Sequence, residues 1–438
     1  RDFTGLEDVR LEWKLEIDGE TIQKGILETL EANPGQSIPI ELNLVGPEVL
    51  PGKEVHLTLL YILKTACKWA NEGHELGWDQ FRIREFENNT EHGGFFIRGH
   101  NSAKISKSKT EIKIESDLGR LSFDTNSGRL KNIRFGDMDL LASSPQLNVW
   151  RAPTDNDGLK AWIGNEEKSV SNLISVCTLS RWLKAGLDQI RLTKERCNVS
   201  EVFTRRDSSA ESGQKQPGLT SLEQNLERSL LHIEVEQCYS CGSISEAFVH
   251  HTIWHVFPDL SLWMENMVMV HEELNDLPRI GISFQLQEGF EEFEWFGNGP
   301  HESYCDRMAG VRVGRFHSTV NEQYVPYIVP QEHGNKTGLR WIILKDVNCS
   351  GLFISGSGLF EGSVSHYPDE HLYSTSHAYR LQSHPETSVY LDYRQRGLGT
   401  GSCGPDTLEQ YLIPSGIHHF DYVFRPFDPR KKDSEELF

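Results

Sequence analysis

The sequence has little basic charge for its length. Its 44 Lys and Arg residues face 64 Asp and Glu residues, which gives a formal net charge of −20. We find no stripe or cluster of basic side chains along the chain. Because proteins hold phosphate backbones with clustered Lys and Arg, this composition argues against a nucleic acid as the partner.

Long apolar runs and cysteines are also scarce. The apolar stretch "VHLTLLYIL" at 55–63 is strand-sized, whereas a membrane-spanning helix needs about 20 residues. Eight cysteines in 438 residues exclude a small disulfide scaffold. The first ten residues, "RDFTGLEDVR", lack the apolar core of a signal peptide. We therefore expect no membrane partner, and these absences favour the cytoplasm, although glycosylation triplets at Asn88, Asn198, Asn335 and Asn348 leave secretion open.

The chain does not begin with Met. It is thus expected to be a fragment of a longer polypeptide, a processed form or the small subunit of a split protein.

The first segment has the pattern of strands and tight turns. Leu11, Trp13, Leu15 and Ile17 alternate with charged residues, as in a half-buried strand. Asp18-Gly19 follows, a dipeptide typical of a hairpin turn. The pattern predicts a small β-sandwich over residues 1–86.

Short strands separated by glycine turns then recur almost to the end of the chain. Residues 87–110 are polar and rich in Gly, Ser and Lys, which predicts a linker. Strand patterns such as "EIKIES", "LHIEVEQCYS" and "TSVYLDY" predict one large all-β domain over residues 111–428. Residues 203–230 are polar and aperiodic, as expected of a surface insertion, and 429–438 form a charged tail.

Three motifs resemble metal-binding or catalytic sites, but their sequence context favours an ordinary structural role. Cys238 and Cys241 form a CxxC without the second ligand pair that zinc requires. His250, His251 and His255 lie in a predicted strand, where helical metal-ligand spacing does not apply. Asn165-Glu166 is the acid/base dipeptide of many glycosidases, but no apolar strand leads into it.

Three denser segments mix turn-forming residues, carboxylates, amides and aromatics. They are "NVWRAPTDND" at 148–157, "WFGNGPHESYCDR" at 295–307 and "PYIVPQEHGNKTGLRW" at 326–341. Aromatic faces combined with carboxylates and amides suit a sugar, which offers C–H faces and hydroxyls. The alternative is buried Arg–Asp pairing that ties loops together, and we favour it for Arg151 and Arg307. The polar and aromatic residues of interest are Arg151, Asp155, Asn156, Asp157, Glu302, Tyr304, Asp306, Arg307, Gln331 and Glu332.

Together with "RGLGTGSCGPDT" at 396–407, these segments resemble the C-terminal domain of glycoside hydrolase family 2 β-galactosidases of the lac type, in the family's order. Upstream, "LEWKLEIDGETIQKG" and "WANEGHELGWDQFRI" resemble the preceding immunoglobulin-like domain. The resemblance covers residues 1 to about 428. It implies an all-β chain, an immunoglobulin-like β-sandwich followed by a large galactose-mutarotase-like β-supersandwich.

The resemblance also implies where the chemistry lies. Family members hydrolyse terminal β-D-galactosides with retention, using two glutamates about 5 Å apart. These glutamates and the Mg²⁺ ligands belong to a TIM barrel that this chain lacks. We therefore expect neither catalytic nor metal-binding residues here, and expect the barrel, the β-galactoside and further subunits of an oligomer as partners.

The resemblance assigns the loop around Cys403 to the sugar pocket. It implies that Gly401, Ser402 and Cys403 line the pocket, with Cys403 shaping the aglycone side rather than acting as a nucleophile. The alternative is a bystander thiol on a structural turn. The segment from Gly158 to about Glu167 matches a mobile rim near the active site.

Two other functions stay open. The chain could be a stand-alone carbohydrate-binding protein that kept its sugar-facing loops. It could also be a mutarotase-like aldose epimerase, although no His–carboxylate pair can be assigned by spacing.

Overall fold

The computed structural model describes residues 2–46, 53–84, 103–158, 177–201 and 229–428. The chain separates into two compact units, Arg1–Asn89 with Arg312–Arg315, and Thr90–Val311 with Phe316–Phe438. Both units are built on antiparallel sheets, so the all-β prediction is confirmed. Among the described residues, no helix has the length and apolar character needed to cross a membrane.

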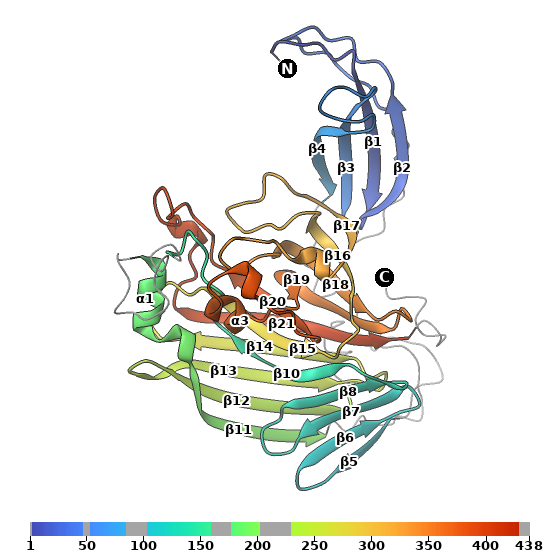
Figure 1. Ribbon diagram of the computed structural model, residues 1–438. Coiled ribbons are helices and arrows are strands. Elements are labelled where there is room, and N and C mark those ends of the chain that lie inside the picture. Colours follow the sequence, from blue (N-terminus) through green and yellow to red (C-terminus); the bar gives the residue numbers. More distant parts are fainter. Residues whose placement is uncertain (1, 47–52, 85–102, 159–176, 202–228, 429–438) are drawn as a thin grey trace. The chain divides into compact units, whose positions relative to one another are not determined.

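The first unit contains one four-stranded antiparallel sheet of order β2-β1-β3-β4 (Figure 1). Leu11, Trp13 and Leu15 are buried, as the alternation predicts. Asp18 and Gly19 adopt φ angles of 48° and 78° and connect the first two strands as the expected hairpin turn. The strands are β1 Val9–Ile17, β2 Glu20–Leu27, β3 Val55–Leu63 and β4 Glu75–Arg84.

A segment without strands completes the core of this unit. Leu30 packs with Val9 and Leu11. Leu42 packs against the cluster that contains Trp13 and Leu15. Residues 28–46 therefore cover the apolar face of the sheet.

The second unit begins with a five-stranded antiparallel sheet of order β5-β6-β7-β8-β9. Its first strand lies inside the segment 87–110, whose composition predicts a linker. Ile105 pairs with Ile114 and packs against the core, which explains why this polar segment forms a strand. The strands are β5 Lys104–Lys107, β6 Glu111–Glu115, β7 Gly119–Asp124, β8 Leu130–Phe135 and β9 Met138–Asp139.

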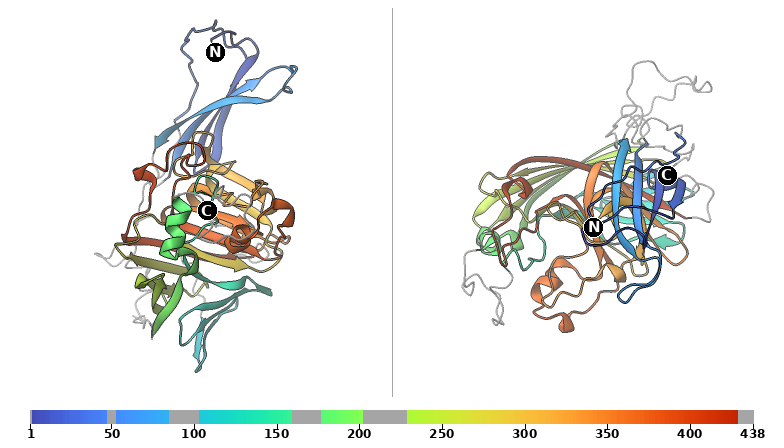
Figure 2. Two further views of the ribbon diagram at one scale, coloured as in Figure 1. Left: turned by 60° about the vertical axis from the view of Figure 1, so that its left-hand side comes forward. Right: turned by 90° about the horizontal axis from the view of Figure 1, so that it is seen from above.

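A curved twelve-stranded sheet forms the rest of the second unit (Figures 1 and 2). Its main path is β10-β15-β20-β19-β21-β14-β13-β12-β11, and β16, β17 and β18 branch from β19. Helix α1 (Thr178–Ala185) and the short helix α3 (Asp369–Ser374) lie in its connections. The strands are β10 Leu141–Asn148, β11 Arg191–Glu201, β12 Leu231–Cys241, β13 Ile244–Val256, β14 Leu262–Val270, β15 Arg279–Leu286, β16 Glu292–Gly299, β17 Arg312–Thr319, β18 Lys336–Lys345, β19 Gly351–Ser365, β20 Thr387–Gln395 and β21 Gly416–Phe427.

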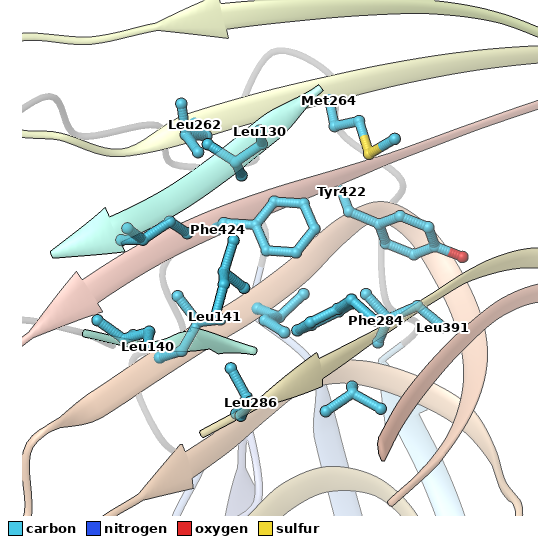
Figure 3. Close-up of a cluster of buried hydrophobic side chains, with 14 of the residues drawn as sticks. Leu130, Leu140, Leu141, Leu262, Met264, Phe284, Leu286, Leu391, Tyr422 and Phe424 are labelled. Atoms are coloured by element: carbon cyan, nitrogen blue, oxygen red, sulfur yellow. The ribbon is translucent and has the colours of Figure 1, made fainter. Parts of the chain in front are cut away.

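The main core lies between the two sheets of the second unit. Leu130 from the small sheet packs with Leu262, Met264 and Phe424 from the large one (Figure 3). Burying a side chain of this size contributes roughly 1.5–3 kcal/mol. The predicted insertion 203–230 lies outside the described residues except for Ser229 and Leu230, and Ser229 is fully buried rather than at the surface.

Strand register brings distant motif segments to one place. Asn148 pairs with Gly281, Gly281 with Asp392, and Asp392 with Glu361, so these residues form one row across four strands. A side chain at Gly281 would place its Cβ 2.2 Å from the Leu391 carbonyl oxygen, so the strands pass closely here. The segments that follow β10 and β20 therefore leave the sheet side by side.

A buried arginine joins these segments below the surface. Arg279 is fully buried, and its guanidinium contacts Glu332 at 2.8 Å, Asp369 at 3.3 Å and Asp392 at 3.5 Å. The three carboxylates come from the segment before β18, from α3 and from β20. An unpaired buried charge would cost several kcal/mol, so this pairing fixes the connections on the sheet.

Three carboxylates around one guanidinium leave an excess of negative charge. Burial raises the pKa of Asp369 to about 7, and the Arg279 guanidinium offsets only part of this rise. Burial likewise raises the pKa of Asp392 to about 6. These two carboxyl groups are therefore protonated more readily than an exposed aspartate.

We expect the protein to lose stability as pH rises from about 4 to about 7, to the extent that Asp369 contributes. Its pKa is about 7 when folded and 3.8 as the ordinary value, so in this window the folded state holds a proton that the unfolded chain releases. Asp369→Asn stays neutral and should flatten the fall in melting temperature between pH 5 and pH 8. Thermal unfolding followed by circular dichroism across this range measures the slope.

The matched control is Asp137→Asn, because Asp137 lies in the turn between β8 and β9, away from this cluster. Its pH slope should equal that of the parent protein. A parent-like slope for Asp369→Asn would show that Asp369 is ionised throughout the range.

Candidate functional site

The motif segments singled out in the sequence converge in one cluster of loops. They lie after β10, after β16, before β18 and after β20. Side-chain and backbone hydrogen bonds connect every one of them to another. The connections are Asp155 N–H to Gln331, Asn156 to Gly399 and Ser402, Asp306 to Leu398 and Gly399, and Glu302 to the Gly334 N–H.

Arg151 and Asp157 form the buried base of the cluster. Both side chains are fully buried, and Arg151 Nη2 donates to the two Asp157 oxygens at 2.9 and 3.0 Å. Arg151 Nη1 also donates to the Arg396 carbonyl oxygen at 2.5 Å. Asp157 accepts a further bond from the Thr154 N–H at 2.9 Å. Arg151 thus ties the loop after β10 to the end of β20, as the loop-tying interpretation expects, and does not reach the surface.

Arg396 provides a second buried cation at the start of the loop that carries Cys403. Its Nε donates to Asp276 at 2.6 Å and its Nη2 to Asp406 at 3.0 Å. Its Nη1 donates to the Thr407 hydroxyl at 2.6 Å. Since Asp406 and Thr407 end the loop that Arg396 begins, this one side chain closes the base of the loop.

The segment after β16 contributes an ion pair and a buried aromatic ring. Glu302 pairs with Arg307 and accepts from the Tyr327 hydroxyl at 2.9 Å and the Gly334 N–H at 2.8 Å. Burial opposes ionisation, but the Gly334 N–H, Arg307 and Tyr327 together lower the pKa of Glu302 below its usual value. Tyr304 is buried, and burial raises its pKa well above the usual value. Arg307 stacks on the Tyr304 ring at 5.1 Å, but it is exposed and pairs with Glu302, so the predicted buried pairing with an aspartate is wrong for this residue.

Gln331 and Glu332 attach the segment before β18 to the same base. Gln331 Oε1 accepts the Asp155 N–H at 3.0 Å. The Glu332 N–H donates to the Ala152 carbonyl oxygen at 3.1 Å, and its side chain pairs with Arg279. Both side chains are buried and connect this segment to β15 and to the loop after β10.

The loop at 398–404 is the exposed part of the cluster. Gly401, Cys403 and Gly404 are exposed, and Ser402 is half-buried. The N–H groups of Cys403 and Gly404 both donate to the Thr400 carbonyl oxygen, at 3.0 and 2.7 Å. The loop therefore presents the Cys403 thiol on a tight internal turn.

The predicted mobile rim falls mostly outside the described residues, as does Asn165-Glu166. Of the rim only Gly158 is described. It has a φ of 113°, and a Cβ there would lie 2.3 Å from the Cys177 sulfur, so the chain passes helix α1 closely. Mobility of the rest stays a prediction.

The other sequence motifs form no ligand site. Cys238 and Cys241 are buried free cysteines in β12. His250 contacts Asn266 at 2.9 Å, and His255 pairs with Glu265 within the sheet. Within the described ranges no three His, Cys, Asp or Glu side chains could hold a metal ion. Asn335 is buried and donates to Ser303 and Glu361, which excludes glycosylation of the folded chain there.

Apart from Arg151, the sequence does not predict the buried arginines and acids that hold the motif segments together. Arg279, Asp369 and Asp392 are far apart in sequence. Pairing of β15 with β20 brings Arg279 near Asp392, and the position of α3 brings Asp369 to them. Asp276 and Asp406 likewise come from distant parts of the chain and meet at Arg396. The sequence places Arg396 directly before the glycine-rich loop, but its burial, which creates the need for acidic partners, appears only in the structure.

Curated relatives of the whole chain are beta-galactosidases. That of Actinobacillus pleuropneumoniae is 28% identical over 428 residues, which cover 97% of this chain and 37% of the relative. That of Priestia megaterium is 26% identical over 416 residues, covering 94% and 35%. The chain thus spans little more than a third of the length of these relatives.

Solved structures with some likeness include a putative aldose 1-epimerase of Escherichia coli and a galactose 1-epimerase of Lactobacillus acidophilus. The first has a TM-score of 0.32 and 10% identity, the second 0.36 and 8%. Each alignment covers 75% of this chain and 99% of the solved chain. Both TM-scores lie below 0.5, so these structures support no conclusion about the function of this chain.

Family models match both units of the chain. The model described as beta-galactosidase, domain 4, matches residues 1–84. The model described as beta galactosidase small chain matches residues 116–425, which is more than half of the sequence and contains all four motif segments of the loop cluster. The chain therefore belongs to the beta-galactosidase small-chain family.

Proposed function

We propose that this chain is the C-terminal, non-barrel portion of a β-galactosidase that hydrolyses terminal β-D-galactosides with retention. In this proposal, loop 398–404 lines a sugar pocket whose catalytic carboxylates belong to a TIM-barrel portion outside the chain. The observation that carries it is the exposed Cys403 on a loop anchored by the other motif segments. The names of the relatives and the third of their length that the chain spans also support it.

The acidic side chains around the loop favour a supporting role over catalysis. A retaining glycosidase needs two carboxyl groups about 5 Å apart, one free to attack and one able to donate a proton. Asp306 accepts two backbone N–H groups, Asp406 pairs with Arg181 and Arg396, and Glu302 pairs with Arg307. These bonds hold the acids as acceptors, so the proposal assigns proton transfer to the barrel.

In this proposal, loop 398–404 contributes to the shape of the sugar pocket. Cys403 is small and exposed, and its thiol can pack against a C–H face of the sugar or of the group attached to it. Gly401 lets the loop approach its support closely, because a Cβ there would lie 2.4 Å from the Asn156 carbonyl oxygen. Ser402 adds a hydroxyl beside the thiol.

We assign the Mg²⁺ implied by the family resemblance to the barrel as well. Among the described residues no three His, Cys, Asp or Glu side chains are grouped so that they could hold a metal ion. Assembly of the complete enzyme into an oligomer is part of the same proposal.

Cys403→Ala in the complete enzyme should change the KM of galactosides with bulky aglycones by about two- to fivefold, because the variant loses the packing of one sulfur atom. The kcat for a small galactoside should change less. Steady-state kinetics with a matched pair of galactosides measures this. Cys67→Ala, an exposed cysteine of the first unit, is the control and should behave like the parent. Identical kinetics for Cys403→Ala with both substrates would make Cys403 a bystander.

The purified chain alone should not hydrolyse an aryl β-galactoside, because the proposed catalytic carboxylates lie elsewhere. Release of the aryl alcohol is measured with the chain alone and after addition of the separately produced barrel portion. Turnover by the pure chain, scaling with its concentration through a final gel-filtration step, would refute the proposed division of labour.

A further inference from the structure

We infer that Asp306 and Asn156 are positioning residues that hold loop 398–404 in one conformation and so set the place of Cys403. This inference rests on the proposed function of the loop. It assigns no contact with substrate to either residue. Both act through the backbone of the loop.

Asp306 holds the start of the loop. Its Oδ1 accepts the Leu398 N–H at 3.0 Å, and its Oδ2 accepts the Gly399 N–H at 2.7 Å. Two successive backbone donors thus converge on one carboxylate, which makes these bonds charge-assisted and strong. A Cβ at Gly397 would lie 2.8 Å from the same carboxylate, so the chain passes it at close range.

Asp306 is itself held in place. It lies in a turn closed by the Tyr304 N–H to the Arg307 carbonyl oxygen at 3.2 Å and the reverse bond at 2.7 Å. Tyr304 is buried, and Arg307 pairs with Glu302. The carboxylate therefore has a fixed direction before the loop meets it.

Asn156 holds the middle of the loop from the other side. Its Nδ2 donates to the Gly399 carbonyl oxygen at 2.9 Å, and its Oδ1 accepts the Ser402 N–H at 3.2 Å. One amide thus bonds both flanks of the turn that carries Cys403. Its neighbour Asp157 is anchored on Arg151, so this support is also rigid.

Asp306 and Asn156 bond to backbone groups that the hydrogen bonds within the loop do not use. Within the loop, Thr400 accepts from Cys403 and Gly404 and donates to the Pro405 carbonyl oxygen at 3.0 Å. These bonds fix the tip relative to Thr400. Asp306 and Asn156 fix Gly399, the residue before Thr400, and Ser402, the residue before Cys403. Without them the tip would keep its shape and move as a whole.

The test uses the complete enzyme with Asp306→Ala, and Asp306→Asn as a variant of the same shape. Asparagine keeps one acceptor oxygen and turns an NH₂ group toward the second backbone donor. The control is Asp346→Ala, which removes a carboxylate that also accepts two backbone N–H groups, those of Asn348 and Ser350 at 2.9 Å each, in the turn between β18 and β19. Each variant is also made together with Cys403→Ala.

Hydrogen exchange of amides 398–404 measures the restraint directly. We expect both Asp306 variants to exchange there about tenfold faster, while β20 and β21 stay unchanged. With Cys403 intact, we expect kcat/KM for a bulky galactoside to fall about two- to fivefold, as for Cys403→Ala itself, because a displaced pocket wall weakens positioning. When Cys403→Ala is already present, we expect little or no further fall, since sites coupled through a shared backbone shift are not additive.

Unchanged exchange in both Asp306 variants would overturn the inference whatever the kinetics. An equal loss of kcat/KM with and without Cys403→Ala would overturn it too, because Asp306 would then act on something other than Cys403. If Cys403→Ala is kinetically silent while exchange rises, the pocket role of Cys403 fails, and Asp306 is left as a structural residue only. Asn156→Asp provides a second arm, since it keeps the acceptor for Ser402 but loses the donor to Gly399.

Discussion

The second unit depends on the burial of three guanidinium groups. Arg151, Arg279 and Arg396 are each at most 1% exposed. A charge removed from water costs several kcal/mol unless an opposite charge and well-formed hydrogen bonds replace the solvent. Most acidic partners of these arginines lie in the segments that connect the strands. Pairing with the arginines therefore fixes where these connecting segments lie. Removing one partner would leave a buried charge without compensation.

The buried arginines also restrain the exposed loop, because the residues that they fix are adjacent in sequence to residues of the loop or to residues that bond it. Asp157 is fixed by Arg151, and Asn156 precedes it. Arg396 is fixed by Asp276, and the glycine-rich loop follows it. Residues that bond the loop are therefore one or two positions from residues that are locked in the core. An exposed glycine-rich loop can in this way be held firmly without burying its own side chains.

Part of this arrangement follows from the sequence and part does not. Alternation at Leu11, Trp13 and Leu15 and the Asp18-Gly19 turn predict β1, β2 and their hairpin, because both signals are local. The motif segments around Arg151, Asp306 and Gln331 can be marked from composition and family resemblance. Their contacts cannot, because the row from Asn148 to Glu361 depends on register across four strands. Strand β5 is not predicted, because Ile105 is its only apolar residue. It forms because it pairs with β6, and the local sequence does not show that pairing.

The excess of acidic residues invites a catalytic interpretation of the loop cluster, and the hydrogen bonds argue against it. A general acid must carry a proton near the working pH, which requires an environment that favours the neutral form. Glu302 has the opposite environment, with a backbone N–H, a guanidinium and a hydroxyl that lower its pKa. Asp406 shares this property, because the hydrogen bonds of Arg181 and Arg396 outweigh its burial and lower its pKa strongly. Of the carboxyl groups with raised pKa, Glu332, Asp369 and Asp392 lie buried around Arg279. Glu361 instead bonds to Asn335 and Gln395, and Asp421 bonds to Trp263 and Ser357. Glu302 and Asp406 are thus held as hydrogen-bond acceptors within the loop cluster, and neither has the environment that a general acid requires.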